Sequence, residues 1–240
     1  MPHLSTALGR ALIAVVSSLA AGLVVCTVPA FASAAPVVPD VGAGLVISTS
    51  PQPGLWGHCV LAGAGRDSAG TRLAWTSGHC ASLGSTIKTA DKKTALGTVI
   101  ARKTFTGEGA LEPNELDYAL IRLRRGVHIG PVPGSPIVAT RIGEPRTGQI
   151  ACKYGAGAVF PGERCGVIGR ITPIEFDAFA FSIFGDSGGP VYTDPHTLIG
   201  MVSRPATVPF VSSTIMTRLT GAIADARAGG HLRGQFQPIA

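Results

Sequence analysis

The sequence is poor in charged residues and lacks the patterns that mark several common classes of functional site. Only 14% of its 240 residues are charged and 45% are hydrophobic, which excludes a chain disordered throughout and allows a packed core. No cluster of Lys and Arg with interleaved aromatic residues is present, so the formal net charge of +6 predicts no nucleic-acid partner. Neither a C-x-x-C nor an H-E-x-x-H pattern occurs, and we expect no metal ion.

Long hydrophobic runs are scarce as well, because only residues 11–28 approach the length that spans a bilayer. Arg10 precedes this run, and small residues follow it, with Ala32 or Ala34 as the last residue of a cleavage signal. The pattern predicts a signal peptide over residues 1–34 and a secreted or cell-envelope protein with no stable membrane anchor after cleavage. A retained anchor and lipid attachment at Cys26 are the alternatives.

Residues 35–53, rich in Pro, Gly and Ser, are expected to form a flexible N-terminal arm. Five cysteines are present, and Cys26 leaves with the signal peptide. The remaining even number suits an oxidising compartment. Three pairings are possible, and we favour the two local ones, Cys59–Cys80 and Cys152–Cys165.

Turn residues and short apolar runs dominate the rest of the chain, which contains 32 Gly and 18 Pro. Strand patterns recur on both sides of a Pro/Gly-rich stretch at residues 130–136, and we expect one of them over residues 178–183. The one convincing helix pattern joins Ile215, Leu219 and Ile223 and stops at Gly229. We therefore predict an all-β protein with two packed antiparallel β-barrels, at residues 54–130 and 131–240, and a C-terminal helix.

Three short segments carry the residues of nucleophilic catalysis, namely 76–80 with His79, 115–121 with Asp117 and 185–190 with Ser187. A serine hydroxyl is a poor nucleophile at neutral pH and needs a base that a third group orients. His79 would accept the proton, and Asp117, placed at the start of an apolar segment, would hold its ring. The backbone amides of Gly185 and Ser187 are candidates for stabilising the oxyanion.

Together the three segments resemble the chymotrypsin-like serine peptidases, whose catalytic residues follow the order His, Asp, Ser. The compact bacterial secreted branch is further indicated by the segments at Cys152–Gly155 and Cys165–Gly166, and the resemblance covers about residues 56–219. It implies two six-stranded antiparallel barrels and a monomeric endopeptidase that needs no cofactor and acts on protein or peptide substrates. It also implies that Lys153 pairs with Asp186, and that Ser203 bonds the catalytic acid and begins the substrate-binding strand.

Two departures from the family pattern concern the substrate groove. Pro205 follows Ser203 and Arg204 on the expected substrate-binding strand, and proline has no N–H to offer to a substrate backbone. Phe181 is expected near the base of the primary pocket, which argues against cleavage after Lys or Arg and for a small or occluded pocket. The alternatives are a catalytically impaired binding or scaffold protein with the same architecture, and an esterase. His58 also precedes a cysteine but lacks the approach that leads to His79.

Overall fold

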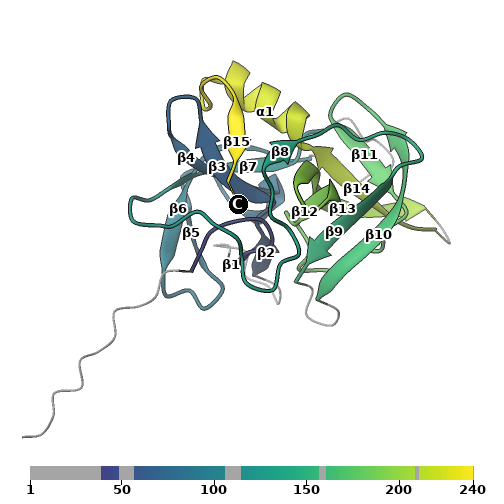
Figure 1. Cartoon of the computed structure of the whole chain (residues 1–240), viewed down its shortest axis with the longest axis horizontal. Coiled ribbons are helices and arrows are strands. Elements are labelled where there is room, and N and C mark those ends of the chain that lie inside the picture. The colour runs from purple at the N-terminus through teal and green to yellow at the C-terminus, as the bar shows by residue number, and fades with distance from the viewer. Residues whose placement is uncertain (1–38, 49–56, 106–114, 157–160, 209–210, 240) are drawn as a thin grey trace, which may run out of the picture. The chain divides into compact units, whose positions relative to one another are not determined.

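Two antiparallel sheets make up most of the chain in the computed structural model, which describes residues 39–48, 57–105, 115–156, 161–208 and 211–239 (Figure 1). The predicted signal peptide at 1–34 lies outside these residues. The described residues belong to one compact unit, Val37–Ala240. No helix within the described residues is long and apolar enough to cross a bilayer.

The first sheet has eight strands in the order β15-β3-β4-β7-β6-β5-β1-β2. Their bounds are β1 Val46–Ser48, β2 His58–Val60, β3 Gly63–Asp67, β4 Arg72–Thr76, β5 Thr86–Thr89, β6 Ala95–Lys103, β7 Tyr118–Leu123 and β15 Phe236–Pro238. The sheet curls round a core of small and branched apolar side chains, including Ile47, Leu61, Leu96 and Ile121. Within the described residues its edge strands β15 and β2 do not pair, so it is an open half-barrel.

The second sheet has seven strands in the order β12-β9-β10-β11-β14-β13-β8, and an additional pairing of β12 with β13 closes six of them into a barrel. Their bounds are β8 Arg141–Ile142, β9 Ile150–Gly155, β10 Gly162–Ile171, β11 Glu175–Ala178, β12 Pro190–Asp194, β13 Thr197–Val208 and β14 Val211–Arg218. Its interior holds Phe176, Val191 and Met216 among others.

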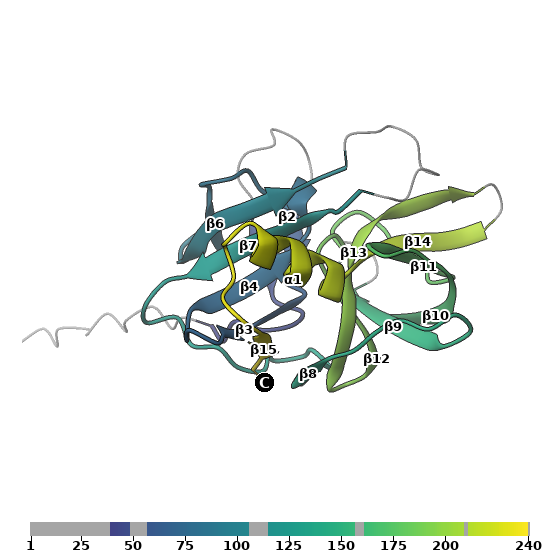
Figure 2. The same ribbon diagram turned by 90° about the horizontal axis from the view of Figure 1, so that it is seen from above.

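A third core cluster joins the two sheets and the helix α1, Leu219–Ala228. Trp75 and Tyr118 from the first sheet pack with Leu198 and Met201 from the second, and the apolar side of α1 covers them. Figure 2 shows α1 lying over β4 and β7 and next to β13. This shared core fixes one sheet against the other, so residues that lie at the sheet ends keep a defined spacing.

The all-β prediction with a C-terminal helix is confirmed, with differences in detail. The first sheet is a half-barrel and not a closed barrel. Part of the predicted flexible arm is ordered, because Val41 and Ile47 are buried and β1 pairs with both β2 and β5. Residues 236–238, which fall in the range predicted for the second barrel and the helix, form the strand β15 and pair with β3 in the first sheet.

Two element boundaries were also misplaced. The strand predicted at 178–183 lies earlier, as β11, because Glu175 to Ala178 pair with β14 whereas residues 181–183 follow an irregular path. The helix begins at Leu219, and Ile215 belongs to β14, where it pairs with Asp177 and Arg204.

Candidate active site

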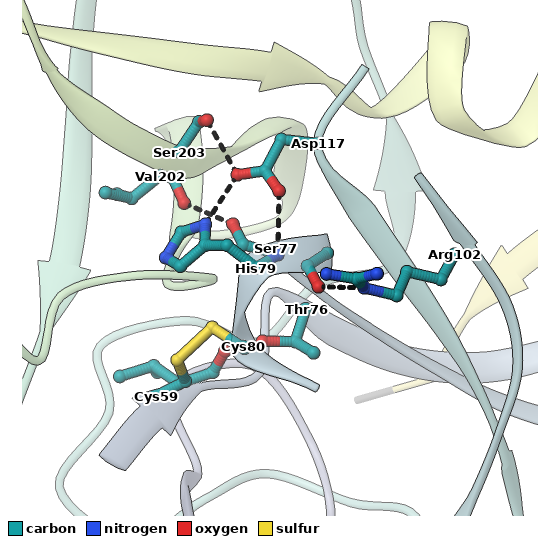
Figure 3. Close-up of a disulfide and its surroundings, with 11 residues drawn as sticks. Cys59, Thr76, Ser77, His79, Cys80, Arg102, Asp117, Val202 and Ser203 are labelled. Atoms are coloured by element: carbon teal, nitrogen blue, oxygen red, sulfur yellow. Dashed lines mark hydrogen bonds and ion pairs between the residues drawn. A yellow bond between two sulfur atoms is a disulfide. The ribbon is translucent and has the colours of Figure 1, made fainter. Parts of the chain in front are cut away.

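His79 lies on the short 3₁₀ helix Gly78–Cys80 that follows β4, beside Asp117 at the start of β7. Asp117 Oδ2 is 2.8 Å from His79 Nδ1, and Asp117 Oδ1 accepts a hydrogen bond of 2.9 Å from the His79 backbone amide (Figure 3). Ser203 Oγ donates a third bond, of 2.7 Å, to Asp117 Oδ2. The carboxylate is fully buried and accepts all three bonds, so its position determines how the ring of His79 is turned.

The segment that carries His79 is held from three directions. The Cys59–Cys80 disulfide ties it to β2, and Arg102 Nε donates a bond of 2.6 Å to the carbonyl oxygen of Gly78 (Figure 3). Ser77 Oγ donates a bond of 2.6 Å to the carbonyl oxygen of Val202 on β13. Contacts from both sheets therefore hold the backbone segment that carries the His79 imidazole.

Ser187 lies in the loop between β11 and β12, where two glycines adopt backbone angles that favour glycine: φ is +96° at Gly185 and +77° at Gly188. The loop is pinned by the Val60 amide, which donates to the Ser187 carbonyl at 2.8 Å, and by the Gly188 amide, which donates to the Val202 carbonyl at 2.8 Å. Within the described residues, the amides of Gly185 and Ser187 donate no hydrogen bond. They remain available to an anionic oxygen at this loop.

Ser187 and His79 line the same pocket, but no hydrogen bond joins their side chains in the described residues. Bonds between nucleophile and base are often long in the absence of substrate and shorten when it binds. The bonds from His79 to Asp117 are formed, whereas the bond that would activate Ser187 is not.

Asp186 is fully buried next to Ser187 and is held by two cations. Lys153 Nζ lies 2.5 Å and Arg164 Nη1 2.8 Å from Asp186 Oδ2, and the Ile183 amide donates to the same oxygen at 3.1 Å. Burial lowers the pKa of Lys153, opposed by its hydrogen bond to Asp186. The predicted partner Lys153 is in place, and Arg164 is a second partner that the sequence analysis missed.

A signal for Arg164 was present in the sequence. Cys152 and Cys165 face each other across β9 and β10, and their disulfide fixes this register. The neighbours inside the hairpin, Lys153 and Arg164, are then directly opposite each other. Cross-strand neighbours share one face of a sheet, so the predicted disulfide, together with the assignment of Lys153 to Asp186, would have placed Arg164 on the same face.

A pocket of about 580 Å³ is bordered by both His79 and Ser187. Its lining is formed by Gly57, His58, Cys59, His79, Cys80, Phe105, Ser182, Ile183, Phe184, Gly185, Ser187, Val202, Ser203, Arg204 and Pro205. Ser203 and Pro205 are among these residues, and His58 also contributes to the wall.

Phe181 does not line this pocket, which corrects its predicted place at the base. Phe181 is 49% exposed, whereas Ala180 before it is buried and its carbonyl oxygen accepts a bond from Thr214 Oγ1. Ser182, Ile183 and Phe184 form this wall instead, and Phe184 is 77% exposed at the rim.

Three further residues of the site were not expected from the sequence. Arg204 forms an ion pair with Glu175 on β11, at 2.7 Å between Nη1 and Oε1. Its guanidinium lies 5.0 Å from the ring centre of Phe105, whose ring centre is in turn 5.8 Å from that of His79. Glu175 and Phe105 lie in segments without a recognisable motif, so no signal in the sequence identified them.

No protein-family model and no curated protein sequence matches the chain. Solved structures do match. Protease A of Thermobifida fusca is 18% identical with a TM-score of 0.59, over 84% of this chain and 99% of that one. The chymotrypsin of Cellulomonas bogoriensis is 19% identical with a TM-score of 0.57, over 83% and 98%.

A third match is the inactivated protease paralogue S-D1 of the scabies mite, 13% identical with a TM-score of 0.51, over 83% of this chain and 100% of that one. The chain therefore has the fold of the chymotrypsin-like serine proteases. An inactivated protease shares this fold, so any activity of the chain depends on its site residues and not on the fold.

Proposed function

We propose that the chain is a secreted serine endopeptidase in which Ser187 is the nucleophile, His79 the general base and Asp117 the residue that orients the base. The observation that carries this proposal is the position of Asp117. Its buried carboxylate accepts bonds from the His79 ring, the His79 amide and Ser203 Oγ. Ser187 lines the same pocket as His79, and within the described residues the amides of Gly185 and Ser187 donate no hydrogen bond.

In the proposed reaction, Ser187 Oγ attacks the carbonyl carbon of a peptide bond while its proton passes to His79 Nε2. Asp117 keeps the other ring proton on Nδ1 and stabilises the imidazolium that forms. The amides of Gly185 and Ser187 donate to the oxyanion. His79 then protonates the leaving amine, and water attacks the resulting acyl-enzyme by the same route in reverse.

The pocket lining favours an uncharged residue before the scissile bond. No Asp or Glu is among the described residues that line the pocket, and the two buried acids behind it are engaged, Asp117 with His79 and Glu175 with Arg204. Ile183, Phe184 and Val202 supply apolar contacts instead. Pro205 removes one donor from the strand on which a substrate backbone would pair.

A second candidate function is a catalytically impaired protein that binds a peptide or protein through the same groove. The observation in its favour is the missing bond between Ser187 Oγ and His79, together with Pro205 on the groove strand. An esterase with the same nucleophile is a third possibility, and ester and peptide substrates compared side by side distinguish it.

Intact-mass analysis after exposure to a fluorophosphonate tests the proposal on the secreted protein and on its Ser187→Ala and His79→Ala variants. We expect one adduct on the wild type and none on either variant. His58→Ala, which changes the other pocket-lining histidine and leaves the bond between His79 and Asp117, should still be labelled. A folded wild-type protein with both disulfides and no adduct would support the binding protein. The same spectra locate the N-terminus, expected directly after Ala32 or Ala34.

A further inference from the structure

The hydrogen bonds around Asp117 continue beyond Ser203 into a buried ion pair. Ser203 Oγ donates to Asp117 Oδ2, and Arg204 Nη1 donates to Ser203 Oγ at 3.2 Å. Arg204 also binds Glu175 through both terminal nitrogens, with Nη1 2.7 Å from Oε1 and Nη2 3.3 Å from Oε2. These contacts form one connected series from Glu175 to His79.

The ion pair is shielded from water, since the side chains of Arg204 and Glu175 are 11% and 1% exposed. Two buried carboxylates, Glu175 and Asp117, are close enough to repel each other, and burial raises the pKa of Glu175, opposed by its hydrogen bond to Arg204. Arg170 on β10 is the other cation that acts on Glu175. Arg204 is thus the cation between the two acids.

The guanidinium also has a fixed orientation. Two-point binding to Glu175 sets its plane, and a planar fork of this kind gives geometric specificity that a lysine lacks. In that plane Nη1 has one proton for Glu175 Oε1 and one for Ser203 Oγ. A hydroxyl that accepts from Arg204 is left with its own proton to donate, and Asp117 Oδ2 is the acceptor in reach.

Arg204 is also connected to His79 through an aromatic ring. It stacks on Phe105, 5.0 Å from the ring centre, and Phe105 in turn lies against His79. The same guanidinium thus contacts the serine that bonds Asp117 and the aromatic ring that lies beside the imidazole.

From this arrangement we infer that Arg204, held by Glu175, is a positioning residue of the proposed serine peptidase: it orients Ser203 toward Asp117 and Phe105 toward His79. The inference rests on the proposed function, because it assigns Arg204 a part in that reaction. Arg204 itself touches neither the nucleophile nor the base through a hydrogen bond. Its contribution is to keep the imidazole in the geometry that proton transfer requires.

Four variants distinguish the effect of the Arg204 charge from the effect of its planar geometry. Arg204→Lys keeps the charge and loses the fork, so kcat should fall about 10- to 100-fold while KM changes little. Glu175→Gln leaves an uncompensated cation near His79, which disfavours the imidazolium, so the acid limb of the kcat/KM profile should move to lower pH. The double variant, Glu175→Gln together with Arg204→Gln, should return the acid limb of the kcat/KM profile to its wild-type position without restoring kcat. Arg141→Gln removes an exposed arginine paired with Asp194 and is the matched control.

A readout that does not need turnover is the low-field resonance of the His79 Nδ1 proton. In a Ser187→Ala background, Arg204→Lys should shift this resonance and Arg141→Gln should not. Thermal unfolding checks first that each variant folds, and Arg204→Lys answers the positional question if Glu175→Gln does not fold. Unchanged kcat and an unchanged resonance in Arg204→Lys would overturn the inference. A wild type that fluorophosphonate leaves unlabelled would instead overturn the proposed function, and the resonance would still decide the role of Arg204.

Discussion

Ser77 Oγ donates a buried hydrogen bond of 2.6 Å to the carbonyl oxygen of Val202, and this bond crosses from one sheet to the other. Ser77 immediately precedes the turn that carries His79, and Val202 immediately precedes Ser203. One bond therefore fixes the distance between the proposed base and the serine that holds its acid.

Replacing Ser77 by alanine should destabilise the fold and slow labelling of Ser187. The carbonyl of Val202 still accepts from the Gly188 amide, so we expect a loss of about 1 kcal/mol in the free energy of unfolding, near the net value of one hydrogen bond. Urea denaturation and the rate of fluorophosphonate labelling measure the two effects. Ser85→Ala is the control, because Ser85 Oγ makes an equally short bond to Ser82 in an exposed turn. Equal losses in the two variants would contradict the prediction.

Lys153→Ala should raise the activation free energy of turnover by more than it lowers the free energy of unfolding. Removing one partner of a buried ion pair commonly costs about 3–5 kcal/mol, but Arg164 stays on Asp186 and reduces that loss. The loop that presents the Gly185 and Ser187 amides would still lose a fixed contact, and oxyanion donors must be placed accurately. Steady-state kinetics and denaturant unfolding of the same preparation compare the two losses. Kinetics of Lys153→Ala equal to those of the wild type would contradict this role of Lys153.

Gly155→Ala should disturb the same loop through the other face of Asp186. A β-carbon at Gly155 would lie 1.9 Å from Asp186 Oδ1, so the buried carboxylate would have to move. We expect a fall in kcat of at least about tenfold, together with reduced stability. The control is Gly221→Ala in α1, where the nearest atom would be 3.4 Å away and alanine suits a helix better. Identical kinetics in the two variants would show that Asp186 tolerates displacement.

The stability of the fold should fall at alkaline pH because of two buried tyrosines. Burial raises the pKa of Tyr118, with a contribution from its bond to Asp225, and burial also raises the pKa of Tyr192 beside Glu163. In the unfolded chain these phenols ionise near pH 10, so stability is complete below that pH and is lost as the pH rises above it. Unfolding curves at successive pH values should show a shallower decline in Tyr118→Phe. A decline as steep as that of the wild type would contradict the assignment.

The sequence predicted the residues whose roles depend on a local motif. His79, Asp117 and Ser187 were proposed because each lies in a recognisable segment, and Lys153 because it follows Cys152. Short apolar runs between turn residues on both sides of residues 130–136 indicated the all-β architecture. These signals are short-range, so one sequence was sufficient to identify them.

The residues that the sequence did not predict depend on contacts between distant segments. Glu175 and Arg204 meet only because β14 lies between β11 and β13, and Phe105 reaches Arg204 from the other sheet. Phe181 was misplaced for a related reason. In the loop before Ser187, the Ala180 carbonyl accepts a bond from Thr214 on the distant strand β14, and the next residue, Phe181, is exposed. Strand order and loop path are tertiary properties that no motif encodes.

The pairing of β15 with β3 has a consequence for the time at which the chain can fold. Phe236 lies opposite Asp67, so the edge of the first sheet pairs residues that are far apart in the sequence. Pairings between such distant segments are slow to form, because a large loop must close before the contact contributes. The first half of a nascent chain thus lacks its final strand until residues 236–238 are available.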